Sequence, residues 1–411
     1  MVGESMEFGP LIKYYRTQKD MTQKQLAEGI CSVPHLSKIE NNSKEANEET
    51  IQLLLDRLQI DMKEISEKEA HIRILLKALL EKIQYYLQRE AEEIFIQLKE
   101  MDGIIPFSAY IYTYELYKYR YLLFTGKLDE AGEKKNLLNK QKKNFSQHER
   151  YLFDYYNAIW LIMKGDYKRA DEAMDKLDLN PNHEFSSGEV LYHRALIKSA
   201  LDQAGYAVHF GKMALQSYMD QHNFKRILHT LMLLGINYTH SEIYEEAMAC
   251  FEHLKRNAEF MQETELLPLV YHNIGFLHQK KRNEAEALEF YDKSLSLQTG
   301  ITFHYLVTLY SIGEIHFANN NFETAKECFC KLSSLSKEFG VKKYFLLAEF
   351  HLVYLEAPEK SISFLEDKVI PFLEDSNGNK EDIMRFYKLL SEHYKQLGVY
   401  QKAVKYLNKI S

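Results

Sequence analysis

Several features that common protein classes need are scarce in this sequence. Only 17 Gly and 7 Pro occur in 411 residues, which argues against a loop-rich sandwich or a disordered chain. The four cysteines, at positions 31, 250, 328 and 330, form neither a CxxC pair nor a disulfide framework. No apolar run approaches the roughly 20 residues that span a bilayer, and the N-terminus lacks the apolar core of a signal peptide. These absences predict a reduced, soluble, cytoplasmic protein without a membrane contact.

Catalytic motifs are missing as well. The sequence holds no GxxxxGK[ST] phosphate loop, no HExxH and no GxSxG. Its 16 His residues are scattered without the spacing of metal ligands, and Cys328 and Cys330 would face different directions on a helix. We therefore predict that the protein is not an enzyme and has no catalytic residue, metal site or cofactor.

Helix-forming residues are abundant instead. Leu, Lys, Glu and Ala dominate, and the 29 Tyr and 23 Phe residues are suited to fill contacts between helices. The composition predicts an all-α fold. The net charge of -7 gives no support to nucleic-acid binding.

The first sixty residues carry the pattern of four short helices. Thr22 and Gln25 have the spacing of a capping box, residues 29–32 are typical of a turn, and Ser32 is suited to cap the helix that follows. Pro34 lies early enough in that helix to be tolerated. The apolar positions expected to face inward, at helical spacing, are Phe8, Leu11, Ile12, Tyr15, Leu26, Ala27, Ile30, Val33, Leu36, Ile39, Ile51, Leu54, Leu55 and Leu58.

The segment TQKQLAEGI…LSKIEN in this region resembles the helix-turn-helix of the Xre/Cro/C1-type repressors. The resemblance implies that the second helix of the motif enters the major groove of DNA. The implied base-reading residues are Ser32, Pro34, His35 and Lys38, with Ser37 on the same outer surface, and the implied phosphate contacts are Thr22, Gln23 and Lys44. Cys31 stands where this family commonly has Gly, which leaves the register of the recognition helix open by one position.

The charge of this segment favours an alternative, a small helical bundle without DNA. Residues 1–62 contain seven basic and ten acidic side chains, a net charge of -3, whereas DNA binding depends on neutralising phosphates. A single basic face could still form if the acidic side chains lie elsewhere, from Lys13, Arg16, Lys19, Lys24, Lys38 and Lys44. One copy would bind weakly, so we expect a dimer on two half-sites about one helical turn apart.

A repeat begins beyond residues 61–70, which we predict to be a linker; the predicted domains are 1–66 and 67–411. Gly235, Gly275 and Gly313 are each followed after twelve residues by Ala, at 247, 287 and 325, and four residues later by an aromatic residue, at 251, 291 and 329. This is the tetratricopeptide pattern, in which small residues let two antiparallel helices touch. Weaker copies are anchored at 79, 119, 158, 195, near 352, and at 391. The spacing predicts a right-handed superhelix of about nine tetratricopeptide-like helix pairs with a concave inner surface.

Counting from the small anchors predicts which side chains line this concave surface. They mix aromatic and long polar groups, and the Asn amides could bridge the backbone of an extended peptide. The predicted peptide-binding residues are Arg120, Tyr155, Tyr192, His229, Asn237, His272, Asn273, Gln279, Tyr310 and Glu314. The alternative for each His and Tyr is packing between helices.

An Xre-type domain joined to nine such pairs resembles the quorum-sensing regulators of Gram-positive bacteria, the Rap, Rgg, NprR, PlcR and PrgX group. The segment QKQLAEGICS…LSKIE is most similar to the NprR- and PlcR-like members. The resemblance implies a transcriptional regulator of double-stranded DNA that binds a re-imported signalling oligopeptide and changes its homodimer or tetramer arrangement. It also leaves open a Rap-like adaptor that sequesters a response regulator of a sporulation relay. A structural scaffold with a repressor-like head is a third alternative.

Overall fold

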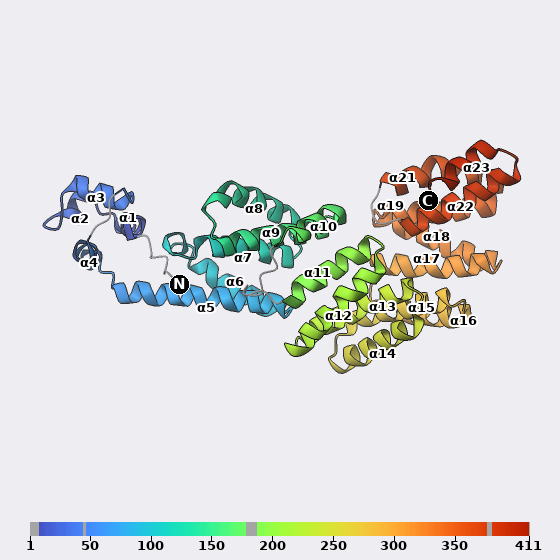
Figure 1. The fold of residues 1–411 in the computed structure, drawn as a ribbon, viewed down its shortest axis with the longest axis horizontal. Helices are drawn as coiled ribbons and strands as arrows, with labels where there is room; N and C mark the ends of the chain where they lie inside the picture. The colour runs from blue at the N-terminus through green and yellow to red at the C-terminus, as the bar shows by residue number, and fades with distance from the viewer. Residues whose placement is uncertain (1–7, 44–46, 178–186, 376–379, 411) are drawn as a thin grey trace. The chain divides into compact units, whose positions relative to one another are not determined.

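The computed structural model describes residues 8–43, 47–177, 187–375 and 380–410 (Figure 1). The regular structure in these ranges is entirely helical. The chain forms two compact units, the first made of Met1–Met163 with Glu172–Glu184, the second of Lys164–Asp171 with Phe185–Ser411. The expected all-α class, with a helix-turn-helix bundle ahead of helical repeats, is confirmed.

Four short helices open the first unit: α1 (Phe8–Gln18), α2 (Gln23–Ala27), α3 (Val33–Glu40) and α4 (Glu48–Arg57) (Figure 1). We call this bundle the head. Its buried core contains the predicted residues Leu11, Ile12, Leu26, Ala27, Leu36, Ile39, Leu54, Leu55 and Leu58, together with Ile60, which was not predicted. The predicted Phe8, Tyr15, Ile30 and Ile51 are partly buried and pack against this core. Val33 was expected to face inward and is instead 38% exposed, because it is the first residue of α3 and precedes the turn that packs on the core.

The predicted linker at residues 61–70 is wrong, because α5 (Met62–Gln84) runs through it. The segment is charged, but it contains neither Gly nor Pro and consists largely of helix formers. A charged segment with few large apolar residues is therefore compatible with a helix.

The first unit continues with helices that pair in order along the chain. They are α5 with α6 (Gln88–Glu100) and α7 (Ile111–Phe124) with α8 (Leu128–Gln141), followed by α9 (Gln147–Met163), which packs on α7 and α8. Helix α10 (Tyr167–Asp175) is divided between the two units. Two 3-10 turns, η1 (Ile105–Phe107) and η2 (Lys142–Asn144), join successive pairs. The ring of Phe107 packs against the head core and lies 5.2 Å from the ring of Tyr14, so the head and the first pairs share contacts within this unit.

The second unit holds the other helix pairs (Figure 1). They are α11 (Ser187–Ala200) with α12 (Ala204–Asp220), α13 (Phe224–His240) with α14 (Tyr244–Phe260), α15 (Leu267–Lys280) with α16 (Glu284–Ser296), α17 (Phe303–Ala318) with α18 (Phe322–Glu338), α19 (Lys342–Glu356) with α20 (Pro358–Phe364), and α22 (Lys380–Gln396) with α23 (Tyr400–Leu407). A 3-10 turn, η3 (Thr264–Leu266), precedes α15, and a π-helical segment, η4 (Leu365–Val369), leads from α20 into α21 (Ile370–Asp375). The described residues thus form eight of the nine predicted pairs, and the third, expected at α9 and α10, falls where the two units divide.

The glycine–aromatic contact predicted from the repeat is present in three consecutive pairs. A Cβ added at Gly235 would lie 2.5 Å from the Phe251 ring, and one at Gly275 or Gly313 would lie 2.8 Å from the ring of Tyr291 or Phe329. The ring therefore packs on the glycine of its own pair. Phe251 also belongs to a core cluster with Val270 and Ile274 of the following pair, so it contributes between pairs as well.

A feature of the turns was not predicted. Seven residues after the anchor of every pair except the eighth, the backbone adopts a positive φ that ends the first helix. The residues at these turns are Tyr86, Gly126, Gly165, Asp202, Glu242, Arg282, Asn320 and Gly398. Only three are glycines, which is why the composition did not reveal the pattern. The eighth pair, predicted to be degenerate near Leu352, instead turns at Ala357 and Pro358, and its second helix contains the π-helical segment.

We predict that Gly235→Ala destabilises the second unit by about 1–3 kcal/mol, because the added methyl group overlaps the fully buried Phe251 ring. Urea unfolding of the full chain, followed by circular dichroism, measures this as a lower midpoint. The matched control is Gly205→Ala in α12, where an added Cβ meets nothing within 4 Å. That control should leave the midpoint unchanged or raise it, since Ala favours a helix by about 0.5–1 kcal/mol. Equal effects of the two substitutions would contradict the role given to the Gly235 contact.

Candidate functional site

The outer surface of α3 presents the side chains expected to meet DNA. Pro34 and Lys38 are exposed, and His35 and Ser37 are half-buried beside them. Ser32 caps the helix, its Oγ accepting the backbone N–H of His35 at 3.3 Å. The Lys38 ammonium makes no ion pair with any described residue, so it is available for a ligand.

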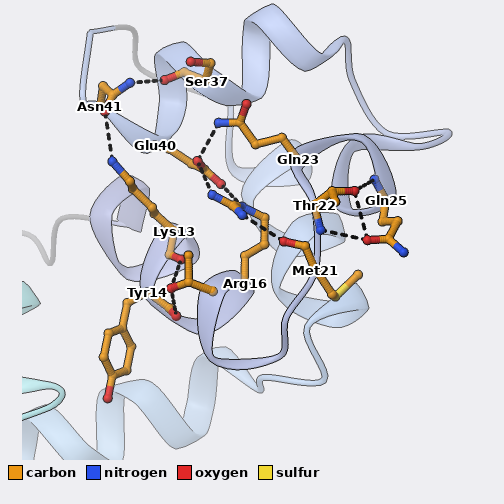
Figure 2. A network of polar contacts seen from close by, with 11 residues as sticks. Lys13, Tyr14, Arg16, Met21, Thr22, Gln23, Gln25, Ser37, Glu40 and Asn41 are labelled. Atoms are coloured by element: carbon orange, nitrogen blue, oxygen red, sulfur yellow. Dashed lines mark hydrogen bonds and ion pairs between the residues drawn. The ribbon is translucent and has the colours of Figure 1, made fainter.

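A buried carboxylate holds α3 against the two helices before it (Figure 2). Glu40 is 2% exposed and accepts two hydrogen bonds from the Arg16 guanidinium, at 2.6 and 3.0 Å. Gln23 donates its amide to the same carboxylate at 2.8 Å, and Arg16 also donates to the carbonyl of Met21 at 2.8 Å. Hydrogen bonding to Glu40 raises the pKa of Arg16, although burial opposes it. This bidentate pair links α1, α2 and α3 and fixes the orientation of the outer surface of α3.

The same network corrects the predicted basic face. Arg16 was expected to join the exposed lysines, but its guanidinium is neutralised by Glu40 and does not face a ligand. Two of the predicted phosphate contacts also have internal partners: Gln23 is bonded to Glu40, and Thr22 forms the predicted capping box with Gln25. Lys44, the third, lies outside the described residues.

Two predicted peptide-binding residues belong to the first unit. Tyr155 is fully buried, and its ring packs against those of Tyr151 and Tyr156. Arg120 is 4% exposed. The structure therefore places both in the packed interior rather than on a lining surface, a correction of the prediction. Counting from the anchor did not anticipate how neighbouring helices cover these positions.

In the second unit, two more of the predicted lining residues are almost fully buried. Asn237 donates its amide to Ser199 Oγ at 2.9 Å and to the carbonyl of Leu233 at 2.8 Å. The Tyr310 ring packs 5.7 Å from that of Tyr344. In each case a first helix of a neighbouring pair supplies the contact, so stacking covers residues next to the anchor. Tyr192, His229, His272, Asn273, Gln279 and Glu314 remain half-buried.

Several of these half-buried side chains already form hydrogen bonds within the protein. Asn273 donates to the Leu269 carbonyl at 2.8 Å, but its Oδ1 accepts no hydrogen bond from any described residue. Gln279 Oε1 accepts the Tyr291 hydroxyl at 2.7 Å. His272 Nδ1 lies 2.9 Å from Thr308 Oγ1, and burial lowers the pKa of His272 to about 4. Burial likewise lowers the pKa of His229 to about 4, so both rings are neutral near pH 7.

A denser polar cluster connects three first helices of the second unit. Glu314 of α17 forms an ion pair with Arg385 of α22, and its Oε1 lies 2.6 Å from Nε2 of His351 in α19. Arg385 also donates to the Tyr310 hydroxyl at 2.6 Å. Only Tyr310 and Glu314 were predicted from the sequence. The Arg385 contact was missed because it joins residues that are 71 positions apart and skips one helix pair.

A cavity of about 550 Å³ in the first unit was also not anticipated. It is lined by Arg73, Ile74, Leu76, Lys77, Tyr110, Thr113, Tyr117 and His148. Arg73 and Lys77 are four residues apart on α5, so their helical spacing was visible in the sequence, but the start of this helix was assigned to a linker.

Among the described residues, no helix combines the length and apolar character that crossing a membrane requires. The same residues bring together no group of three or more His, Cys, Asp or Glu side chains able to hold a metal ion.

Comparison with known proteins gives matches to both parts of the chain. Residues 12–65 match the helix-turn-helix family, and residues 266–338 match the tetratricopeptide repeat family. The transcriptional activator NprA of Geobacillus stearothermophilus is 25% identical over 398 residues, covering 93% of this chain and 97% of NprA. The regulatory protein RapD of Bacillus subtilis (strain 168) is 25% identical over 252 residues, covering 58% of this chain and 71% of RapD.

Solved structures share the fold. The ligand-free quorum sensor NprR from B. thuringiensis superposes with a TM-score of 0.69 at 24% identity, covering 83% of this chain and 98% of that chain. NprR in complex with its cognate peptide NprX gives a TM-score of 0.67 at 23% identity, covering 83% and 97%. The two matched families, the relative aligned with nearly the whole chain and the shared fold all fit the Rap, Rgg, NprR, PlcR and PrgX group of regulators.

Proposed function

We propose that this protein is a cytoplasmic transcriptional regulator whose head binds operator DNA and whose second unit binds a short, re-imported signalling peptide. The observation that carries the proposal is the union, in one chain, of an exposed recognition surface on α3 with a repeat array whose half-buried polar groups can accept a ligand. Similarity to a transcriptional activator along 93% of the chain supports the union of the two parts.

For DNA, the head supplies a preorganised helix rather than a strong positive field. Glu40 fixes α3, so Pro34, His35, Ser37 and Lys38 meet DNA without a cost for ordering. With a net charge of -3 over residues 1–62, a single head gains little from phosphates. We therefore propose that a homodimer or tetramer presents two heads to half-sites, with Ser32, Thr22, Gln23 and Lys44 near the backbone or base edges.

For a peptide ligand, the second unit offers oxygen atoms that can accept hydrogen bonds. An extended peptide has unpaired backbone N–H groups, and the Oδ1 atom of Asn273 can accept one of them while its amide stays bonded to α15. Tyr192, His229, His272 and Gln279 would line the same groove. A peptide alters DNA binding only if it prefers one arrangement of the protein over another. The proposed function is therefore regulatory, not catalytic.

A second function has its own support. Similarity to RapD covers 58% of the chain, and the acidic head is a poor match for DNA. In this alternative the protein is an adaptor that sequesters a response regulator of a sporulation relay, with or without DNA binding. The two functions differ in whether the outer surface of α3 is needed.

Lys38→Ala should weaken binding to DNA selected in vitro by the full-length protein about 5- to 100-fold, because a base contact contributes roughly 1–3 kcal/mol. Fluorescence anisotropy at several salt concentrations measures the change. Lys337→Ala is the control, since it removes the same charge from an exposed position in α18. If no DNA sequence is selected, or if both variants bind equally, the adaptor is favoured.

Asn273→Ala should weaken binding of oligopeptides selected from a random library on the wild-type protein about 10-fold, the effect of losing one hydrogen bond of about 1–1.5 kcal/mol. Isothermal titration calorimetry measures the affinity. Asn257→Ala is a close control, because Asn257 makes the same bond to the carbonyl four residues earlier, at 2.7 Å, but lies on the second helix of its pair. Unchanged affinity in the Asn273 variant would remove this residue from the groove.

A further inference from the structure

The cluster around Glu314 has the composition of a site for a cation, and a cation from the chain itself occupies it. The Glu314 side chain is 16% exposed; its Oε2 pairs with Arg385, and its Oε1 lies 2.6 Å from His351 Nε2 without the geometry of a hydrogen bond. The Tyr310 hydroxyl accepts a second guanidinium N–H at 2.6 Å. The carboxylate and the hydroxyl thus converge on one guanidinium group.

The walls of this site are rigid. The His351 ring stacks on the Phe329 ring, with centroids 4.3 Å apart and planes 4° from parallel. His351 is 4% exposed and Tyr310 is 8% exposed, so neither can move without disturbing the core. The acceptor groups are therefore held in place whether or not Arg385 is present.

The occupant is the more exposed member of the ion pair. The Arg385 side chain is 43% exposed, against 16% for Glu314. If the pair separates, Arg385 can enter water, and it already lies 3.9 Å from Asp382 on its own helix. Glu314 would be left as a mostly buried carboxylate without a cation, which is costly. Replacing Arg385 by another cation therefore costs less free energy than leaving the Glu314 carboxylate without one.

We propose that Glu314, with Tyr310 and His351, is the receptor for a basic side chain of the ligand peptide, and that Arg385 occupies this receptor in the ligand-free chain. The inference rests on the proposed peptide-binding function and adds the chemical class of the ligand. A lysine or arginine of the peptide displaces Arg385, which then pairs with Asp382 or with water.

The displacement also removes a link within the second unit. Arg385 belongs to the ninth helix pair, whereas Glu314 and Tyr310 belong to the seventh. Lys343 of α19 pairs with Asp382 at 2.7 Å, so the ninth pair keeps one ion pair to the eighth when Arg385 leaves. Ligand binding would therefore loosen the ninth pair from the seventh without detaching it.

The test uses two synthetic peptide libraries of equal length, one with Lys or Arg and the other with Leu at a scanned position. The wild-type protein should bind the basic members at least 10-fold more tightly at one position, and Glu314→Gln should abolish this preference while still binding neutral peptides. Arg385→Met, which removes the guanidinium and keeps a long unbranched side chain, should tighten binding of the basic peptides several-fold and leave neutral ones unchanged. Calorimetry on the full-length protein measures all affinities.

The control is Glu356→Gln, which removes an exposed carboxylate that pairs with Lys326 at 2.9 Å and should change no preference. Thermal melts verify that each variant is folded. If peptides bind without a preference for basic residues, or if Arg385→Met weakens binding because Arg385 itself holds an acidic group, this inference is overturned and the peptide-binding function stands. If no peptide of either library binds the wild-type protein, the proposed function fails and the inference fails with it.

Discussion

The two helices of a pair can approach closely because one of them carries almost no side chain where the other presents an aromatic ring. At Gly235, Gly275 and Gly313 even a methyl group would overlap the ring of Phe251, Tyr291 or Phe329. The rest of the second unit depends on this distance. It sets the angle between paired helices, and that angle determines which residues of the first helices reach the inner face. The polar cluster around Glu314 lies one position beyond such a glycine, so its geometry follows from the same contact.

The head depends on a different interaction, a buried charge with a complete set of partners. Burying Glu40 without partners would cost several kcal/mol, but Arg16 and Gln23 supply three hydrogen bonds. The result is a recognition helix fixed by the two helices before it. The same ion pair neutralises the positive charge of Arg16, which would otherwise attract DNA phosphates. The head thus loses electrostatic attraction and gains a defined orientation of α3.

Much of the fold could be predicted from the sequence, because it is encoded in short-range signals. The caps at Thr22 and Ser32, the apolar spacing of the head and the twelve-residue distance between small residues each act within one or two helices. The linker was mispredicted because charge alone does not distinguish a loop from an exposed helix. The candidate site was harder to predict from the sequence. Whether Tyr155 or Asn237 faces a ligand depends on helices that are close in space but distant in sequence, and no periodicity reports that.

Arrays of this kind are usually described by the intrinsic stability of each unit and its coupling to the adjacent units. The Arg385 contact departs from that description, since it joins the seventh and ninth pairs across the eighth. The eighth is also the pair that lacks the positive-φ turn and contains a π-helical segment. The contact between the seventh and ninth pairs therefore spans the eighth, which is the most irregular pair. The last three pairs would then unfold as one cooperative block, and a ligand that removes the coupling would change the size of that block.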